Sequence, residues 1–251
     1  MEISVVIHTL NSESVIRQCL ESVKGFDEII LCDMYSSDNT LAIAREYGAT
    51  IVLHEPCGGI PEPARVFAIG QATKEWVFVV DSDEVVPPAL KEYLYRSLSQ
   101  AIPSEALFVP RRNFFMNKYM HSSFPDYQLR FFRKDKFVTW PPTVHSRPQI
   151  DGAVRRIPAR KELAFIHLET NRIRAVVAKM NRYTDCEMDQ SKNRNVGVGR
   201  LIGKPLYRFV QVYIFKGGFR DGKAGLIYAL LQMYYKFIAL SKCIEKREVA
   251  D

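Results

Sequence analysis

The amino-acid sequence predicts an α/β protein with a mostly parallel sheet. Short apolar runs alternate with helical patterns about every 25 residues over the first hundred positions, which is typical of strand–helix–strand units. The run at residues 76–80 holds no polar position, as expected of a strand that is buried on both faces. It ends in Asp81-Ser82-Asp83-Glu84, at the kind of sheet edge where α/β proteins bind ligands.

The individual elements follow from apolar spacing and from capping residues. We expect strands at residues 3–7, 28–32, 50–53, 76–80, 107–110 and 127–133. We expect helices at residues 15–23, 40–48, 63–71, 88–98, 171–189, 201–215 and 224–235. Neither a G-x-G-x-x-G fingerprint nor a G-K-[ST] phosphate loop follows the first strand, so polar side chains would have to hold any nucleotide.

Charge is segregated along the 251 residues, although the net charge is +7. Residues 1–100 carry 7 Lys+Arg and 15 Asp+Glu, a net charge of −8. Residues 101–151 carry 8 and 4, and residues 152–251 carry 20 and 9, which gives +11 for the last hundred residues. The basic C-terminal part therefore suits an anionic partner such as a membrane surface, a phosphorylated acceptor or nucleic acid.

The cysteines and the N-terminus indicate a cytoplasmic protein. Five cysteines, an odd number without metal-binding spacing, indicate reduced thiols. They are Cys19, Cys32, Cys57, Cys186 and Cys243. Met1 and Glu2 lead directly into the first expected strand, so we expect no signal peptide.

Asp81 and Asp83 stand two residues apart at the end of the buried strand. Two carboxylates held this closely repel each other. A divalent cation such as Mg²⁺ or Mn²⁺ removes that repulsion and can share its shell with phosphate oxygens. We therefore expect Asp81 and Asp83 to bind a metal, with Ser82 beside the ligand. The alternative is a solvated acidic turn.

The loops after the first two strands supply further candidates for nucleotide binding. They contribute Thr9, Leu10, Asn11, Glu13, Asp33 and Ser37. Asp33 ends its strand at the same sheet edge as Asp81, where it can accept hydrogen bonds from a base or a ribose. The alternative for Asp33 is to cap the helix that begins near Thr40, a role that we favour for Asp38.

Arginines in the middle of the chain suit a diphosphate, because one guanidinium binds two phosphate oxygens at once. Arg65 lies in the helix after the glycine-containing loop, and Arg111 and Arg112 follow a strand. Arg130 and Arg133 are three residues apart in an expected strand, so they point to opposite faces. We expect Arg130 to point into the site and Arg133 to lie at the surface.

These features resemble an inverting glycosyltransferase of family 2 with a GT-A fold. The residues that carry the resemblance are SVVI (4–7), the helix at 15–23, DEIILCD (27–33), SDNT (37–40) and DSDE (81–84). In that family the first Asp, here Asp33, contacts the nucleotide base. The resemblance also implies that the D-x-D cluster holds Mg²⁺ or Mn²⁺ on the diphosphate of a sugar nucleotide.

The remainder of the chain is similar to the lipopolysaccharide core β-glucosyltransferase branch of that family. The similar segments are YQLRFFR (127–133), VH (144–145), KMNRYT (179–184) and GGFRDGKAGL (217–226). The likeness spans about residues 3–245. It implies transfer of a hexose from a UDP-sugar to a cell-envelope glycan, such as lipopolysaccharide core or a lipid-linked saccharide.

One position departs from that branch. The histidine that corresponds to His145 is usually followed by Glu, the best-placed catalytic base, whereas this chain has Ser146, whose hydroxyl is too weak a base. Asp126 or His145 can supply the base instead, or an acceptor that is already anionic needs none. The alternative for Asp126 is a turn residue, and His145 can also be a metal ligand or a structural histidine.

The chain divides by composition into a catalytic domain and a helical extension. The catalytic domain is residues 1–165, with a nucleotide-binding part at 1–100 and an acceptor-side part at 101–165. The basic, aromatic-rich extension is residues 166–251, whose apolar stretch at 224–235 is shorter than the roughly 20 residues of a membrane span. Amphipathic helices of this composition suit the cytoplasmic face of the inner membrane. The alternative is packing on the catalytic domain or on a second copy in a homo-oligomer.

The sequence thus predicts a metal-dependent glycosyltransferase, with polyprenyl phosphate as an alternative acceptor. A haloacid-dehalogenase-like phosphatase is a second alternative, because residues 81–85 fit D-x-D-x-[TV]. That fold requires its cluster after the first strand and a later acidic metal pair, and neither is found. A nucleic-acid-binding protein would leave the acidic cluster unexplained and shows no recognition motif, so we expect no nucleic-acid partner.

Overall fold

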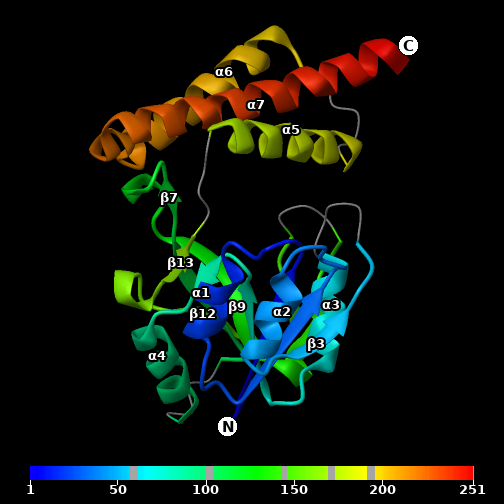
Figure 1. Cartoon of the computed structure of the whole chain (residues 1–251). Helices are drawn as coiled ribbons and strands as arrows, with labels where there is room; N and C mark the ends of the chain where they lie inside the picture. Colours follow the sequence, from blue (N-terminus) through cyan, green and yellow to red (C-terminus); the bar gives the residue numbers. More distant parts are fainter. Residues whose placement is uncertain (57–61, 100–103, 143–145, 169–172, 191–195, 251) are drawn as a thin grey trace. The chain divides into compact units, whose positions relative to one another are not determined.

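The structure is a computed structural model that describes residues 1–56, 62–99, 104–142, 146–168, 173–190 and 196–250. The chain forms two compact units (Figure 1). The sheet unit comprises Met1–Arg112 and Pro125–Leu168, and the helical unit comprises Asn113–Phe124 and Glu169–Asp251. The segment Asn113–Phe124 thus belongs to the helical unit, whereas the sequence-based division kept it with the catalytic part.

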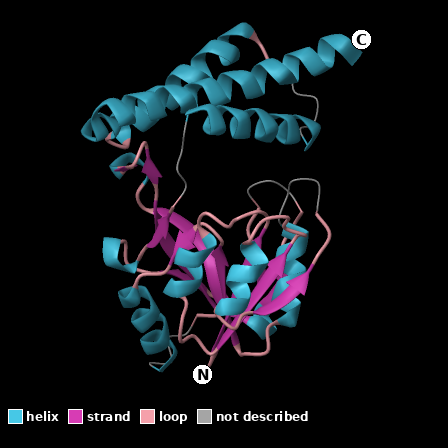
Figure 2. Cartoon of the chain, viewed as in Figure 1, coloured by secondary structure: helices cyan, strands magenta, loops and turns pink. Residues whose placement is uncertain are grey.

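Among the described residues, nine strands form one mixed sheet (Figure 2). They are β1 (Ile3–Thr9), β2 (Glu28–Asp33), β3 (Thr50–Leu53), β4 (Trp76–Asp81), β5 (Glu84–Val85), β6 (Ala106–Arg112), β9 (Asp126–Arg133), β12 (Val154–Arg156) and β13 (Phe165–His167). The order is β3-β2-β1-β4-β9-β6-β13-β5, with β12 beside β6. Strands β3, β2, β1 and β4 run parallel, whereas β9 is antiparallel to β4 and β6. The predicted mostly parallel α/β class is confirmed.

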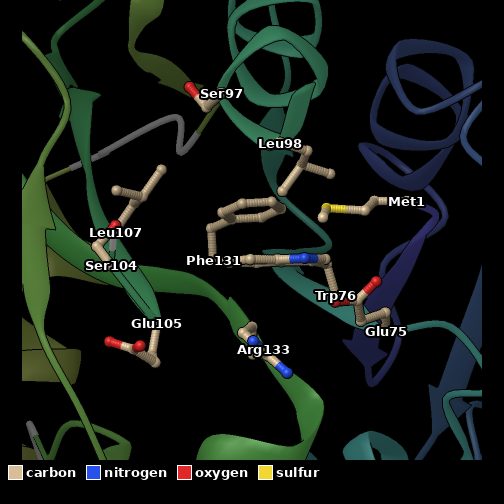
Figure 3. A pocket seen from close by; sticks show the side chains of 10 residues that line it. All are labelled: Met1, Glu75, Trp76, Ser97, Leu98, Ser104, Glu105, Leu107, Phe131 and Arg133. Atoms are coloured by element: carbon tan, nitrogen blue, oxygen red, sulfur yellow. The ribbon is translucent and has the colours of Figure 1, made fainter. Parts of the chain in front are cut away.

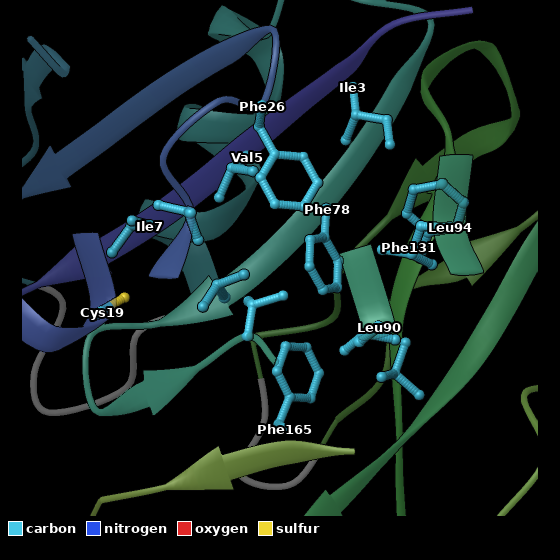
Figure 4. Close-up of a cluster of buried hydrophobic side chains, with 14 of the residues drawn as sticks. Ile3, Val5, Ile7, Cys19, Phe26, Phe78, Leu90, Leu94, Phe131 and Phe165 are labelled. Carbon is cyan, nitrogen blue, oxygen red and sulfur yellow. The ribbon is translucent and has the colours of Figure 1, made fainter. Parts of the chain in front are cut away.

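Helices cover both faces of this sheet. Side chains of α1 (Ile16–Ser22), α2 (Thr40–Glu46) and α4 (Pro88–Ser99) share one buried cluster, and those of α3 (Glu62–Gln71) share another. Ile3, Val5 and Ile7 of β1 lie in the first cluster (Figure 4), and Val6 lies in the second. Because successive side chains of a strand point to opposite faces, burial on both faces explains the unbroken apolar runs in the sequence.

The helical unit combines three long helices with a short hairpin. The helices are α5 (Ile173–Gln190), α6 (Val198–Val210) and α7 (Gly222–Ala250), and the hairpin strands are β7 (Phe114–Phe115) and β8 (Lys118–Tyr119). A π-helical turn, Gln211–Phe215, continues α6. Helix α7 packs against both α5 and α6, and Phe115 and Met120 of the hairpin segment pack on Ala224 of α7.

The remaining elements are short. A second hairpin joins β10 (Phe137–Thr139) to β11 (Gln149–Ile150). The 3₁₀ turns are η1 (His121–Ser123), η2 (Lys134–Lys136), η3 (Lys161–Leu163) and η5 (Gly218–Asp221).

Helix α7 is longer than the sequence pattern predicts. The expected apolar helix at 224–235 extends to Ala250, because no glycine or proline interrupts the helix formers after Lys236. Among the described helices, the segment Gly218–Lys246 is long and apolar enough to cross a membrane by length and composition, with a mean hydropathy of 1.2 over its most apolar 18 residues. Core helices of soluble proteins share this property.

A cavity of about 240 Å³ lies in the sheet unit near the amino ends of β4 and β6 and the carboxyl end of β9. Trp76, the first residue of β4, stacks on Phe131 there, with ring centroids 4.9 Å apart (Figure 3). Met1 precedes β1 and also lines this cavity. The acidic cluster follows the opposite, carboxyl end of β4, so this cavity is not the candidate site.

Candidate active site

The carboxyl ends of β1, β2 and β4 meet at one edge of the sheet. In the parallel register, His8 of β1 lies opposite Asp81 of β4, and Thr9 lies opposite Asp33 of β2. Polar side chains that follow three separate apolar runs are therefore brought together by strand pairing. This is the edge at which open α/β sheets bind ligands.

Asp81 is held between two buried arginines. Its Oδ1 accepts a hydrogen bond from Arg65 Nη2 at 2.9 Å, and its Oδ2 accepts one from Arg130 Nη2 at 2.6 Å. Both guanidinium groups lie over the ring of Trp140, with Cζ 4.8 and 5.6 Å from the ring centroid. Burial raises the pKa of Asp81, but the positive charges of Arg130 and Arg65 outweigh it and leave the pKa well below its usual range. Asp81 is thus a fixed carboxylate.

His8 lies beside this ion pair. Its Nε2 is 3.4 Å from Asp81 Oδ1 and 3.1 Å from Arg65 Nη2. Burial and the nearby charge of Arg65 lower the pKa of His8 to about 3. The imidazole is therefore neutral near pH 7, and it acts here as a hydrogen-bonding group without charge.

Asp83 meets a residue that the sequence analysis missed. His167, the last residue of β13, has its Nε2 3.2 Å from Asp83 Oδ2. The carbonyl of Asp83 also accepts the N–H of Leu168 at 2.7 Å. Burial lowers the pKa of His167, but the hydrogen bond and charge of Asp83 outweigh it and raise the pKa. The sequence did offer a signal for His167, because it is a polar residue at the end of a short apolar run, as Asp81 is.

Asp126 and Glu84 share one arginine. Arg111 donates to Asp126 Oδ2 from Nη2 at 2.8 Å and from Nε at 3.0 Å, and to Glu84 Oε1 from Nη1 at 3.1 Å. Asp126 is the first residue of β9 and so lies in a strand, not in a turn. Burial and the charge of Asp81 raise the pKa of Glu84. Burial lowers the pKa of Arg111, but the two carboxylates Glu84 and Asp126 outweigh it and raise the pKa.

The loops after β1, β2 and β4 are hydrogen-bonded to one another. Asn11 Oδ1 accepts the N–H of Ser37 at 2.8 Å, and Glu13 Oε2 accepts a backbone N–H at the start of α2 at 3.0 Å. Ser12 Oγ lies 3.0 Å from Ser82 Oγ, which joins the acidic loop to the first loop. The expected nucleotide-binding residues are therefore brought together at one place.

Asp33 orders the loop that follows β2. It is fully buried and accepts hydrogen bonds from the N–H and the hydroxyl of Ser36, at 2.8 and 2.5 Å. At the start of α2 the N-cap residue is Asn39, and the preceding Asp38 accepts the N–H of Thr40 on Oδ1 at 3.0 Å. Leu10, in the loop before Asn11, is exposed.

Four polar atoms near this edge are buried without a hydrogen-bond partner in the described part of the chain. They are Thr9 Oγ1, Glu62 Oε2, Arg130 Nη1 and Trp140 Nε1. Buried polar groups are normally satisfied, because an unmet one costs about 1–3 kcal/mol. Such atoms beside Asp81 therefore indicate a place where a polar ligand binds.

His145, an expected catalytic residue, and its neighbour Ser146, which replaces the family's usual Glu, have different outcomes. His145 lies outside the described residues. Ser146 donates a hydrogen bond from Oγ to the carbonyl of Pro141 at 2.6 Å. Within the described residues, no group of three or more His, Cys, Asp or Glu side chains is arranged to hold a metal.

This sheet, with its carboxylates and arginines at the carboxyl edge, is a GT-A fold. The sequence model of the glycosyl transferase family 2 matches residues 4–162, and the chain belongs to that family. Members transfer sugars, so the protein is a glycosyltransferase. Membership excludes the phosphatase alternative, and the acidic loop follows the fourth strand in the chain, not the first.

Relatives match nearly the whole chain. It is 27% identical to the lipopolysaccharide core biosynthesis glycosyltransferase LpsC of Rhizobium meliloti (strain 1021), over 98% of this chain and 93% of that protein. It is 26% identical to an uncharacterized glycosyltransferase of Rickettsia conorii (strain ATCC VR-613 / Malish 7), over 97% and 90%.

Solved structures share the fold at low sequence identity. Residues 1–349 of S. aureus TarS, in complex with UDP-GlcNAc, match with a TM-score of 0.54 and 16% identity over 100% of this chain and 93% of that chain. Glucosyl-3-phosphoglycerate synthase from Mycobacterium tuberculosis, in complex with phosphoglyceric acid, matches with a TM-score of 0.51 and 16% identity over 75% and 79%.

Proposed function

We propose that this protein transfers a hexose from a UDP-sugar to a saccharide of the bacterial cell envelope, such as lipopolysaccharide core, with inversion at the anomeric carbon. In this proposal the transfer reaction takes place on the cytoplasmic side. The acceptor class is supported by the 27% identity with LpsC along nearly the whole chain. The choice of a uridine nucleotide follows the fold neighbour TarS, whose structure contains UDP-GlcNAc.

The observation that best supports the proposal is the hydrogen bonding of the Arg130 guanidinium. Its Nη2 binds Asp81, whereas its Nη1 is buried without a partner among the described residues. A buried guanidinium with an unused donor is an anion-binding group, because its planar fork matches two phosphate oxygens. We assign Arg130, with Arg65 beside it, to the diphosphate of the donor, where positive charge stabilises the departing nucleotide.

The nucleoside part of the donor binds, in this proposal, at the loops after β1 and β2. The residues involved are Thr9, Leu10, Asn11, Glu13, Asp33, Ser37 and, from the acidic loop, Ser82. Their mutual hydrogen bonds hold the loops ready before the donor arrives, which lowers the entropy cost of binding.

A divalent cation fits beside Asp83 and His167. Asp83 Oδ2 and His167 Nε2 are separated by 3.2 Å, so one cation could contact both, and a carboxylate oxygen and an imidazole nitrogen are both ligands of divalent ions. One carboxylate and one imidazole leave most of the shell to diphosphate oxygens, and the nitrogen ligand favours Mn²⁺ over Mg²⁺. The cation, when bound, would neutralise charge on the leaving diphosphate. Asp81, expected as a second ligand, has both oxygens bonded to arginines here.

Asp126 remains the proposed base for an acceptor hydroxyl. Arg111 fixes one of its oxygens, and the other accepts a hydrogen bond from Gln128 at 2.9 Å. Its side chain is 31% exposed, so an acceptor can reach it. His145 is the competing proposal for this role and for a metal ligand.

The test measures UDP release by the full-length protein from a panel of UDP-hexoses, with Mn²⁺, with Mg²⁺ and with a chelator. Truncated lipopolysaccharide cores and polyprenyl phosphate are offered as acceptors in parallel. We expect metal-dependent transfer to a saccharide hydroxyl, with the product anomer inverted by NMR. Transfer to polyprenyl phosphate alone would replace the proposed acceptor, and absence of UDP-sugar binding in all conditions would refute the donor.

A further inference from the structure

Helix α6 and the π-helical turn after it present an apolar stripe to solvent. The stripe consists of Val198, Ile202, Leu206, Val210 and Ile214, whose exposed fractions range from 39% at Val210 to 73% at Val198. Residues four apart are neighbours on a helix, so these side chains form a row along α6 that winds around the axis by about 40° at each step. The neighbouring residues Pro205 and Val212 are buried, and α6 packs on α7.

The stripe is a row of exposed apolar residues, not a single isolated one. Single apolar residues are common on protein surfaces, whereas a contiguous row marks an interaction site. Two exposed aromatic residues, Tyr207 and Phe215, extend it, at 61% and 72% exposure. A tyrosine ring with its polar tip is favoured at the level of lipid headgroups, and phenylalanine is typical of the apolar face of an interfacial helix.

The charge around the stripe indicates what covers it. Residues 196–220 contain five basic residues and no acidic residue. They are Arg200, Lys204, Arg208, Lys216 and Arg220. Lys204, Lys216 and Arg220 are exposed, whereas Arg208 is tied to Gln211 and Gln232. A positive rim beside aliphatic side chains is complementary to an anionic bilayer.

A second copy of the chain fits this face less well. A two-fold dimer places the same patch against itself, so this acid-free, basic segment would meet its own positive charges. Protein interfaces are also depleted in lysine. The charge pattern therefore favours lipid.

We propose that the α6 stripe docks the protein on an anionic phospholipid bilayer, with the helix lying in the plane of the interface. The aliphatic side chains enter the acyl boundary, and the exposed lysines contact the headgroups. This proposal does not depend on the sugar or on the acceptor.

The test is flotation of the full chain with vesicles of phosphatidylcholine, with or without phosphatidylglycerol. We expect binding to the anionic vesicles, weakened in high salt because screening removes the headgroup attraction. Ile202→Glu combined with Leu206→Glu should lower binding at least about tenfold. Lys204→Ala and Lys216→Ala should each lower it about fivefold. Val138→Glu, an equally exposed apolar site in the sheet unit, is the matched control and should bind like the wild type.

Three outcomes would overturn the proposal. The first is equal binding of the wild type to both vesicle types, and the second is unchanged binding of the double glutamate variant. The third is a wild type that self-associates in sedimentation velocity without binding vesicles, which would assign the stripe to a second copy. If the double variant fails to fold, the two lysine variants test the proposal instead, and unchanged vesicle binding in both would overturn it. Loss of binding in Leu230→Glu on α7, with the α6 variants intact, would place the membrane contact on α7 instead.

Discussion

Arg130 and Asp81, 49 residues apart in the chain, form a buried ion pair with 2.6 Å between Nη2 and Oδ2. The pair links β9 to the end of β4 and places a guanidinium at the edge where the donor is proposed to bind. One side chain thereby supports the fold and the proposed chemistry. The same is not true of Arg133, which pairs with Asp135 at the surface, as predicted.

We predict that Arg130→Ala lowers both donor affinity and stability. The change leaves Asp81 Oδ2 without its donor while Arg65 still binds Oδ1, so the cost should be below the roughly 3–5 kcal/mol of a buried charge that loses its only partner. Arg133→Ala is the matched control, because its exposed ion pair contributes only about 0–1 kcal/mol. Urea unfolding and UDP binding by calorimetry measure the two effects. Equal behaviour of both variants would contradict the assignment of Arg130.

His167→Ala should abolish the metal-dependent part of donor binding. Removing even an outer partner of a metal site typically lowers metal affinity about 10- to 100-fold, and a direct ligand should cost at least as much. UDP binding is measured against increasing Mn²⁺, and binding without metal serves as the internal reference. His54→Ala, whose ring contacts Phe67 and the carbonyl of Glu55, should behave as wild type. An unchanged Mn²⁺ dependence in His167→Ala would remove His167 from the proposed site.

Asp126→Asn should retain donor binding and lose transfer by about 10²–10⁴, if Asp126 is the base. The kinetics are measured with donor saturating, together with thermal unfolding, because the change also alters the contact with Arg111. A near-normal kcat would show that the base lies elsewhere, with His145 or an ionised acceptor as the remaining choices. A loss of kcat that tracks a loss of folded protein would indicate a structural role.

Asp221 should make the helical unit sensitive to acid. Its buried carboxylate accepts bonds from the N–H and Nδ1 of His121 and from the N–H and hydroxyl of Ser122, at 2.8–3.0 Å. Burial raises its pKa, but these hydrogen bonds outweigh it and lower the pKa. The unfolded state therefore binds a proton more readily, so this stabilisation is complete above about pH 4 and is lost as pH falls through the lower folded pKa.

The measurement for Asp221 is hydrogen exchange of α7 and the hairpin between pH 5 and pH 3. At pH values where the wild-type carboxylate is ionised, these amides should be less protected from exchange in Asp221→Asn than in the wild type, by about 1–3 kcal/mol. Its protection should then change less on acidification than that of the wild type. Asp135→Asn, at an exposed pair, is the control. Parallel pH profiles of Asp221→Asn and the wild type would contradict the prediction.

Replacing two glycines of the helical unit by alanine should have opposite effects on stability. A Cβ at Gly225 would lie 1.9 Å from the carbonyl oxygen of Gly218, so Gly225→Ala forces the turn before α7 apart and should cost about 1–3 kcal/mol. A Cβ at Gly203 meets nothing within 4 Å, so Gly203→Ala should stabilise α6 by about 0.5–1 kcal/mol. Thermal unfolding followed by helical circular dichroism compares them. Equal shifts in Tm would refute the close contact.

The sequence by itself determined the elements that depend on local patterning. Apolar runs predicted six strands of the sheet to within two residues of their bounds, because burial on both faces requires unbroken hydrophobic positions, whereas the short strands β5, β12 and β13 were not predicted. The polar residues that close these runs, Asp33 and Asp81, were predictable for the same reason. Family membership was also visible in these residues.

Only the tertiary structure decided which distant groups meet. His167 reaches Asp83, 84 residues away, because the short strand β13 pairs with β5 and β6. Likewise the antiparallel pairing of β6 with β9 sets Arg111 beside Asp126. A three-residue strand carries too little periodicity to predict its partner, and that partner is chosen by hydrogen bonding and packing across the whole sheet. The exposure of the apolar stripe on α6 was likewise decided by the packing of α6 on α7. Sequence periodicity predicts an apolar face of a helix but not what covers that face.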